Sequence, residues 1–303
     1  MKRALWCYQG FQSVAQCIED MIRPLGYQLD IVDSTLPLEE QVSDVHVLFP
    51  SSGRITREVL EKAKVLQIIL QPAAGYENID LHSASSLGIP VCNAPGHNAS
   101  ATAEITVYLM LAVARRVREA ESVLTHGGIG RPFGMELRGK TLGIIGSGKI
   151  GKIVEGICQN GFGMRILTVK TSSSELEWSN LLAESDFISI HCPLSESTRG
   201  MINKNVLSKM KKGVLLVSCA RAAIVDYNDL LEAVRSGHVG GLGLDVHWEE
   251  PVDMSREIYS HPRVVSLPHI GSSSEEAVES VSHACTENLR RFLVQEPLLN
   301  RLA

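Results

Sequence analysis

The sequence predicts an α/β fold with parallel sheets, and three observations support this prediction. Short apolar runs recur from one end of the chain to the other, separated by stretches in which apolar residues have helical spacing. Within each run the apolar residues do not alternate with polar ones, which is typical of parallel strands covered by helices on both faces. A length of 303 residues, of which 44% are hydrophobic and 21% are charged, suits about two globular domains.

The expected strands form two series, one on each side of an apolar helix near residues 99–118. The first series comprises 3–8, 44–50, 66–71 and 89–94. The second series comprises 141–146, 164–169, 187–192, 213–219, 240–246 and 263–267. We expect the helix between them to begin after a turn, with Ser100 as its N-cap. Its middle is apolar nearly all round, so it must be buried on several sides, either between the domains or against a second subunit.

Composition argues against several classes of protein. The net charge of -5 and the lack of long Lys/Arg blocks argue against a nucleic-acid partner. The longest apolar run, at 105–114, is shorter than the roughly 20 residues that a bilayer span needs, and no targeting segment is visible. Seven cysteines without a C-x-x-C pair indicate reduced, buried thiols in a cytoplasmic protein, with a catalytic cysteine as the alternative. We expect no membrane partner and no metal.

A glycine-rich motif stands between two expected strands and opens a helix. The helix that follows carries Ile150, Val154 and Ile157 on one face. In this setting the first glycine permits a tight turn, the second lets backbone amides approach a pyrophosphate, and the third lets helix and strand pack closely. The N-terminus of the helix favours the anion. We therefore predict a dinucleotide site at Gly146, Ser147, Gly148, Lys149, Ile150 and Gly151.

The residue that ends the second strand of this unit departs from the usual pattern. Lys170 stands about 20 residues beyond the glycine motif, where a site for NAD has an acid that binds the ribose hydroxyls. A carboxylate there repels the 2′-phosphate of NADP, whereas Lys170 and the hydroxyls of Thr171, Ser172 and Ser173 attract it. The sequence favours NADP. The alternative is a solvated loop lysine at a site that accepts NAD.

Three polar residues stand just beyond the carboxyl ends of later strands, where ligands bind in open α/β sheets. They are Arg221, Glu250 and His269. Each alone could be structural, but together they offer a guanidinium that binds carboxylates, an imidazole that transfers protons and a carboxylate that tunes it. An imidazole has an ordinary pKa near 6.5, which a neighbouring carboxylate raises, so an imidazolium can be present at neutral pH.

At this point the chain resembles the D-isomer-specific 2-hydroxyacid dehydrogenase family. The resemblance covers most of the chain in the family's order, and the later stretches are more specific to the family than the glycine motif. The matching stretches are AAGYENIDL (73–81), GIPVCNAPGHNASATAE (88–104), ELRGKTLGIIGSGKIG (136–151), residues 181–226, GHVGGLGLDVHWEEP (237–251) and LPHIGSSS (267–274).

The resemblance implies a role for each candidate residue. His269 would donate a proton to the substrate carbonyl, Glu250 would stabilise the protonated imidazole, and Arg221 would hold a 2-oxo acid. Backbone amides near Ala74 and Gly75 would bind the substrate carboxylate, and Asp245 would meet the nicotinamide carboxamide. Further contacts to the cofactor are implied for His191, Pro193, Thr198, Ser218, Cys219, Ala220 and Gly271.

The resemblance also implies an architecture. Two flavodoxin-like or Rossmann-like doubly wound domains would flank a cleft, with a substrate domain formed by 1–98 plus 271–303 and a dinucleotide domain formed by 99–270. A homodimer would form around the helix near 100–118. One departure concerns the loop after the catalytic arginine, where Ala222-Ala223 replaces a glycine that could adopt positive φ.

These observations favour an oxidoreductase that uses NADP, or alternatively NAD, to reduce a small 2-oxo acid to a 2-hydroxy acid. Glyoxylate and hydroxypyruvate are the first candidates. A dehydrogenase of a bulkier D-2-hydroxy acid is a second hypothesis, with Arg54 and Trp248 as residues that could shape the pocket. A third is a cofactor-sensing protein similar to a transcriptional co-repressor, which the retained Arg221, Glu250 and His269 oppose.

Overall fold

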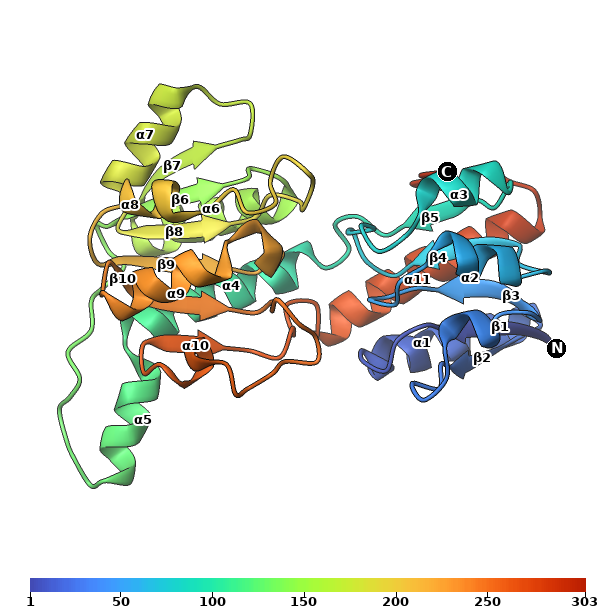
Figure 1. Ribbon diagram of the computed structural model, residues 1–303, viewed down its shortest axis with the longest axis horizontal. Coiled ribbons are helices and arrows are strands. Elements are labelled where there is room, and N and C mark those ends of the chain that lie inside the picture. Colours follow the sequence, from blue (N-terminus) through green and yellow to red (C-terminus); the bar gives the residue numbers. More distant parts are fainter. The chain divides into compact units, whose positions relative to one another are not determined.

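The computed structural model describes residues 1–303, which form two compact units. Met1–Asn98 and Ser272–Ala303 make the first unit, and Ala99–Gly271 make the second (Figure 1). Each unit has one parallel sheet with helices on both faces, so the α/β prediction is confirmed. Gly271, which the sequence division assigns to the first unit, groups with the second, where its amide donates to Asp245.

The first unit has a five-stranded sheet in the order β2-β1-β3-β4-β5. Its strands are β1 (Lys2–Trp6), β2 (Tyr27–Ile31), β3 (Val45–Phe49), β4 (Ile68–Gln71) and β5 (Val91–Asn93). Its helices are α1 (Gln12–Ile22), α2 (Arg57–Lys62), α3 (Leu81–Ser86) and α11 (Glu275–Leu293), with 3-10 turns η1 (Arg23–Leu25) and η2 (Leu38–Glu40). Helices α1 and α11 cover one face of the sheet, and α2 and α3 cover the other.

The sequence prediction omits β2, and the reason lies in its position at the edge of the sheet. Its residues, YQLDI, alternate between buried and more exposed positions, with Tyr27 and Leu29 buried and Gln28 exposed. A search for unbroken apolar runs finds strands buried on both faces and passes over such an edge strand.

The second unit has a six-stranded sheet in the order β11-β10-β9-β8-β6-β7. Its strands are β6 (Thr141–Ile145), β7 (Arg165–Val169), β8 (Phe187–Ile190), β9 (Val214–Ser218), β10 (Val239–Leu244) and β11 (Val264–Ser266). Its helices are α4 (Ala99–Ala114), α5 (Val117–Thr125), α6 (Lys149–Phe162), α7 (Glu175–Glu184), α8 (Lys204–Ser208), α9 (Tyr227–Arg235) and α10 (Glu257–Ser260), with a 3-10 turn η3 (Ala222–Ile224).

The apolar helix expected near 99–118 is two helices in the structure. It breaks at Arg116, whose φ of 52° is left-handed and incompatible with a continuous helix. Helix α4 already includes Ala99, so Ser100 lies in its first turn and is not the N-cap. One face of α4 packs on β10, where an added Cβ at Gly243 would lie 3.0 Å from Leu109 Cβ.

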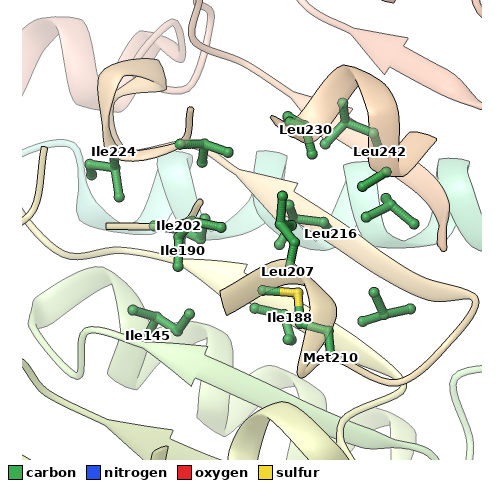
Figure 2. Packing of buried hydrophobic residues seen from close by; sticks show 14 of the residues in the cluster. Ile145, Ile188, Ile190, Ile202, Leu207, Met210, Leu216, Ile224, Leu230 and Leu242 are labelled. Carbon is green, nitrogen blue, oxygen red and sulfur yellow. The ribbon is translucent and has the colours of Figure 1, made fainter. Parts of the chain in front are cut away.

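Burial on both faces explains why the strand sequences are unbroken apolar runs. In β6, Leu142 and Ile144 face the cluster that contains α4 and α6. Ile145 faces the opposite cluster, beneath α7, α8 and α9, and Figure 2 shows its neighbours Ile188, Ile190 and Leu216 packed there. Burying a side chain of this size stabilises the fold by roughly 1.5–3 kcal/mol, so each strand is held from two sides.

Both sheets share one winding pattern. In each, the second strand in sequence lies on one side of the first, and all later strands continue on the other side. This is the flavodoxin-like order, and it creates a topological switch point beside the first strand, at β1 in one unit and at β6 in the other. Ligands in such sheets bind beyond the carboxyl ends of the strands at this point.

None of the helices combines the length and apolarity that crossing a membrane requires.

Candidate active site

The glycine loop follows β6 at the switch point of the second sheet. Gly146 has a φ of 103°, which favours glycine, and a Cβ there would lie 2.5 Å from the amide nitrogen of Cys192. A Cβ on Gly151 would lie 2.3 Å from the carbonyl oxygen of Gly146, so this position must also be small. Gly148, in contrast, has open space where its side chain would be.

The start of α6 suits an anion. Gly148 is the N-cap of this 14-residue helix, and no side chain caps the first turn. The helix dipole adds positive potential at this point, which favours a negatively charged group. With the open space at Gly148, these residues fit the pyrophosphate of a dinucleotide.

The ends of β8 and β9 lie beside this loop. The His191 amide donates to the carbonyl of Ile145 at 2.7 Å, and burial lowers the pKa of His191 to about 4, so its imidazole is neutral. Thr198 closes the following loop by donating its hydroxyl to the Pro193 carbonyl at 2.7 Å. Two buried polar atoms here have no hydrogen-bond partner, Nδ1 of His191 and Oγ of Ser218.

The thiols near these strand ends are not suited to nucleophilic catalysis. Burial raises the pKa of Cys192 to about 11 and that of Cys219 to about 12. All seven cysteines are free, and six of them are buried. A thiol that stays protonated at neutral pH is a poor nucleophile, so the geometry gives the catalytic-cysteine alternative no support.

Lys170 begins an ordered turn after β7, at the position where the cofactor's ribose was expected. The side chains of Lys170, Thr171 and Ser172 are exposed. Ser173, however, accepts the Lys170 amide at 3.2 Å, and Ser174 caps α7 in a reciprocal pair with Glu177. The serine run is thus divided, because its last two hydroxyls hold the turn and the helix.

Glu250 and His269 form a close ion pair although they follow different strands. Nδ1 of His269 lies 2.9 Å from Oε2 of Glu250, and both side chains are 23% exposed. Burial alone would raise the pKa of Glu250, but the hydrogen bond and charge of His269 outweigh it, and the pKa lies below its ordinary value. The other carboxylate oxygen accepts the His247 amide at 3.2 Å. The carboxylate is therefore ionised and aimed at one imidazole nitrogen.

Two more side chains connect the same segments. Asp245 is buried and accepts the amides of Ile270 at 2.8 Å and Gly271 at 2.7 Å. His247, which the sequence analysis does not select, pairs through Nε2 with the Leu267 carbonyl at 2.7 Å. We call these three contacts and the Glu250–His269 pair the clasp, because together they hold residues 267–271 against residues 245–250. In the sequence, the position of His247 two residues after Asp245 could have indicated that it also contacts the segment around His269.

Arg221 follows β9 and lies in the second unit with the clasp. Its Nη1 donates to the Ala220 carbonyl at 2.9 Å. The following residues form η3, and neither Ala222 nor Ala223 has positive φ, so alanine fits this loop without strain. Trp248 donates its indole N–H to the Val225 carbonyl at 3.0 Å, which braces the loop before Glu250 from within the unit.

Ala74 and Gly75 lie in the loop after β4 of the first unit, where the side-chain amides of two buried residues bind their carbonyls. Gln71 Nε2 donates to the Gly75 carbonyl at 2.7 Å, and Asn93 Nδ2 donates to the Ala74 carbonyl at 2.7 Å. Anchoring the carbonyls in the interior fixes the orientation of the loop's peptide planes. Arg54 lies in the loop after β3 with an exposed side chain.

Comparison with known proteins agrees with this arrangement. The family model described as D-isomer specific 2-hydroxyacid dehydrogenase, NAD binding domain, matches residues 107–271. A glyoxylate reductase of Thermococcus litoralis is 39% identical over 275 residues, which cover 84% of this chain and 82% of the relative. The chain belongs to the D-isomer-specific 2-hydroxyacid dehydrogenase family. It is thus an oxidoreductase with a nicotinamide cofactor, as the sequence predicts.

Further similarities span this dehydrogenase from end to end. A hydroxypyruvate reductase of Thermotoga maritima is 38% identical over 281 residues, covering 88% of this chain and 92% of the relative. A crystal structure of a Thermus thermophilus protein superposes with a TM-score of 0.89 at 33% identity, covering 99% of this chain and 100% of the other. D-3-Phosphoglycerate dehydrogenases also match, and the chain spans 52% of the length of the Homo sapiens protein.

Proposed function

We propose that this dehydrogenase reduces a small 2-oxo acid, glyoxylate or hydroxypyruvate, to the corresponding hydroxy acid, and that it prefers NADPH. The observation that carries the proposal is the 2.9 Å contact between Glu250 and His269 in the unit that also holds the glycine loop. Relatives named glyoxylate reductase and hydroxypyruvate reductase, 39% and 38% identical, support the choice of substrates.

His269 acts as the acid in this proposal. Its Nδ1 is committed to Glu250, so Nε2 holds the proton that passes to the substrate oxygen as the carbonyl is reduced. The carboxylate of Glu250 favours the protonated imidazole, because a charge-assisted hydrogen bond is stronger than a neutral one. In the reverse reaction the neutral imidazole accepts the same proton.

Arg221 of the second unit is a substrate-binding residue in this proposal. A guanidinium presents donors in a planar fork that matches a carboxylate and the adjacent carbonyl oxygen, where negative charge develops, so Arg221 orients the 2-oxo acid and stabilises its charge. For the Ala74–Gly75 loop of the first unit we propose, from the resemblance, backbone contacts to a carboxylate. Its two carbonyls are held by Asn93 and Gln71, which leaves the loop's amides as the donors.

The nicotinamide cofactor, when bound, exchanges a hydride with the substrate carbon. We assign its pyrophosphate to the loop of Gly146–Gly151 and its nicotinamide to the ends of β8, β9 and β10, with Asp245 at the carboxamide. The remaining contacts follow from the resemblance, namely Pro193, Thr198, Ser218, Cys219, Ala220 and Gly271.

We assign NADP preference to the turn after β7. Lys170 is exposed there and Thr171 and Ser172 add hydroxyl donors, so the turn offers attraction to a 2′-phosphate and lacks the carboxylate that would repel it. Ser173 supports the turn, because its hydroxyl oxygen accepts the Lys170 amide, and its O–H remains a donor.

We further propose a homodimer formed through α4, α5 and the loop that follows. The end of α5 and this loop extend away from the body of their unit (Figure 1). They carry large apolar side chains that are mostly exposed in the single chain, namely Leu124, Ile129 and Phe133, with Tyr108 and Leu111 of α4 half-exposed nearby in sequence. A second copy would cover this surface.

The seven free cysteines support a reducing compartment, and we assign the protein to the cytoplasm.

The test is the absorbance at 340 nm of NADPH or NADH with glyoxylate, hydroxypyruvate, pyruvate and a branched 2-oxo acid. We expect the highest kcat/KM with one of the first two acids and NADPH. In His269→Ala, kcat should fall by a factor of about 100 to 10,000 while cofactor affinity stays near normal, since an acid catalyst is removed and the cofactor's binding residues remain. A preference for the branched acid, or an active His269→Ala, would refute the proposal.

A further inference from the structure

The conformation of His269 requires support from its surroundings. Its φ of 56° lies in the left-handed region, which residues with a Cβ rarely adopt. Such a backbone persists only where neighbouring contacts over-determine it. Here contacts reach residues on both sides of His269, since Leu267 is bound by His247 while Ile270 and Gly271 are bound by Asp245. The clasp therefore holds the turn that directs the imidazole.

Both ring nitrogens of His247 lie within hydrogen-bond distance of a partner. The residue is 8% exposed. A carbonyl oxygen can only accept, so Nε2 donates its hydrogen to Leu267 at 2.7 Å. Nδ1 lies 3.1 Å from the hydroxyl of Tyr259, and the two rings meet edge to face with centroids 5.3 Å apart. One tautomer satisfies both partners.

The backbone of His247 completes the connection. Its amide donates to Oε1 of Glu250, the carboxylate whose other oxygen binds His269. One residue therefore contacts the carboxylate through its main chain and the segment that precedes His269 through its side chain. A hydrophobic residue at position 247 would keep the main-chain hydrogen bond to Glu250 and lose the side-chain hydrogen bond to Leu267. The Leu267 carbonyl would then be without its donor.

We propose that His247 is a positioning residue for the reaction: by tying Leu267 to the segment that carries Glu250, it sets the imidazole of His269 on its carboxylate. The inference rests on the roles proposed for Glu250 and His269. His247 itself touches neither substrate nor cofactor in this scheme, and it acts through the geometry of the pair.

The decisive variant is His247→Phe, which keeps a ring and removes both side-chain hydrogen bonds. We expect kcat for 2-oxo acid reduction at pH 8 to fall roughly tenfold, since small displacements of reacting groups cost large factors in rate. The pH profile of kcat/KM should change, because the contact between Glu250 and His269 is displaced, while the KM for NADPH stays within about twofold. His247→Gln restores a donor and an acceptor and should recover most of the lost kcat.

His238→Phe is the matched control. His238 Nε2 lies 2.8 Å from the Leu207 carbonyl in the same unit, so its loss removes a comparable bond at a site that the mechanism does not use. We expect it to lower the melting temperature without changing kcat or the pH profile. The positioning role is refuted if His247→Phe behaves like this control. If His247→Phe does not fold, His247→Leu removes the same bond to Leu267 with a smaller apolar side chain, and an unchanged kcat and pH profile in that variant refutes the role.

His269→Ala separates the two proposals. An active His269→Ala overturns the proposed function and the positioning role with it. An inactive His269→Ala together with a wild-type rate and pH profile in His247→Phe overturns the positioning role alone.

Discussion

Replacing Glu250 by glutamine removes the negative charge from the Glu250–His269 pair and keeps its volume. The wild-type contact is 2.9 Å between side chains that are each 23% exposed, so solvent screens it only in part. A hydrogen bond to a charged group contributes about 1.5–3 kcal/mol, against about 0.5–1.5 kcal/mol for a neutral one. The difference, about 1–1.5 kcal/mol, is the interaction with His269 that the variant loses, and it corresponds to roughly a tenfold factor in rate.

The effect should therefore depend on pH. We expect kcat for reduction by Glu250→Gln to fall roughly tenfold at pH 8 and to approach the wild-type value at pH 5.5, where the solvent supplies protons more readily. The assay is NADPH oxidation at 340 nm with saturating glyoxylate or hydroxypyruvate, and the KM for NADPH serves as the control. An equal loss at both pH values would refute the reasoning, because it would show that the carboxylate does not act through protonation of His269.

The ionisation of Glu250 should also make the stability of the fold depend on pH. Because the pKa of Glu250 is lowered in the folded protein, the pair stabilises the fold above the unfolded pKa of about 4.3, and this contribution is lost as pH falls through the folded pKa. The melting temperature of the wild type should exceed that of Glu250→Gln at pH 6, and the two should converge once the pH falls below the lowered pKa of Glu250 in the folded protein. A difference that persists in acid would mean that the glutamine disturbs packing.

The remaining predictions concern the cofactor and the assembly. Lys170→Asp should shift the ratio of kcat/KM for NADPH over NADH toward NADH by at least tenfold, and an unchanged ratio would show that Lys170 does not read the phosphate. Gly151→Ala should lower unfolding stability by about 1–3 kcal/mol, since its Cβ would lie 2.3 Å from the Gly146 carbonyl oxygen. Gly148→Ala should fold normally, because its Cβ meets only open space. It should weaken NADPH binding measured by fluorescence, because the Cβ occupies the space proposed for the pyrophosphate. Equal stability losses in Gly151→Ala and Gly148→Ala would contradict these separate roles. The double change Ile129→Asp and Phe133→Asp should convert a dimer to a monomer in light scattering, and an unaltered mass would place any interface elsewhere.

The strand–loop–helix unit from β6 to α6 could be predicted from sequence because most of its features are local. Its strand lies at 141–145, within the expected 141–146, and Gly151 is constrained by the nearby carbonyl of Gly146. The apolar runs also record burial on both faces directly, which is why the second series of strands was predicted with small errors in its bounds. The edge strand β2 and the break at Arg116 carry no such pattern, since each depends on what the neighbouring elements cover.

The sequence by itself determined which residues bring chemistry to the ends of the strands, because residue type and position along a strand are written in the chain. Tertiary structure alone decided how they are held. Residues 245–250 and 267–271 are brought together by the pairing of β10 with β11, and only then do His247 and Asp245 acquire partners across the gap in sequence. A hydrogen bond between distant segments requires both to be placed within about 3 Å, and no periodicity in the chain encodes that placement.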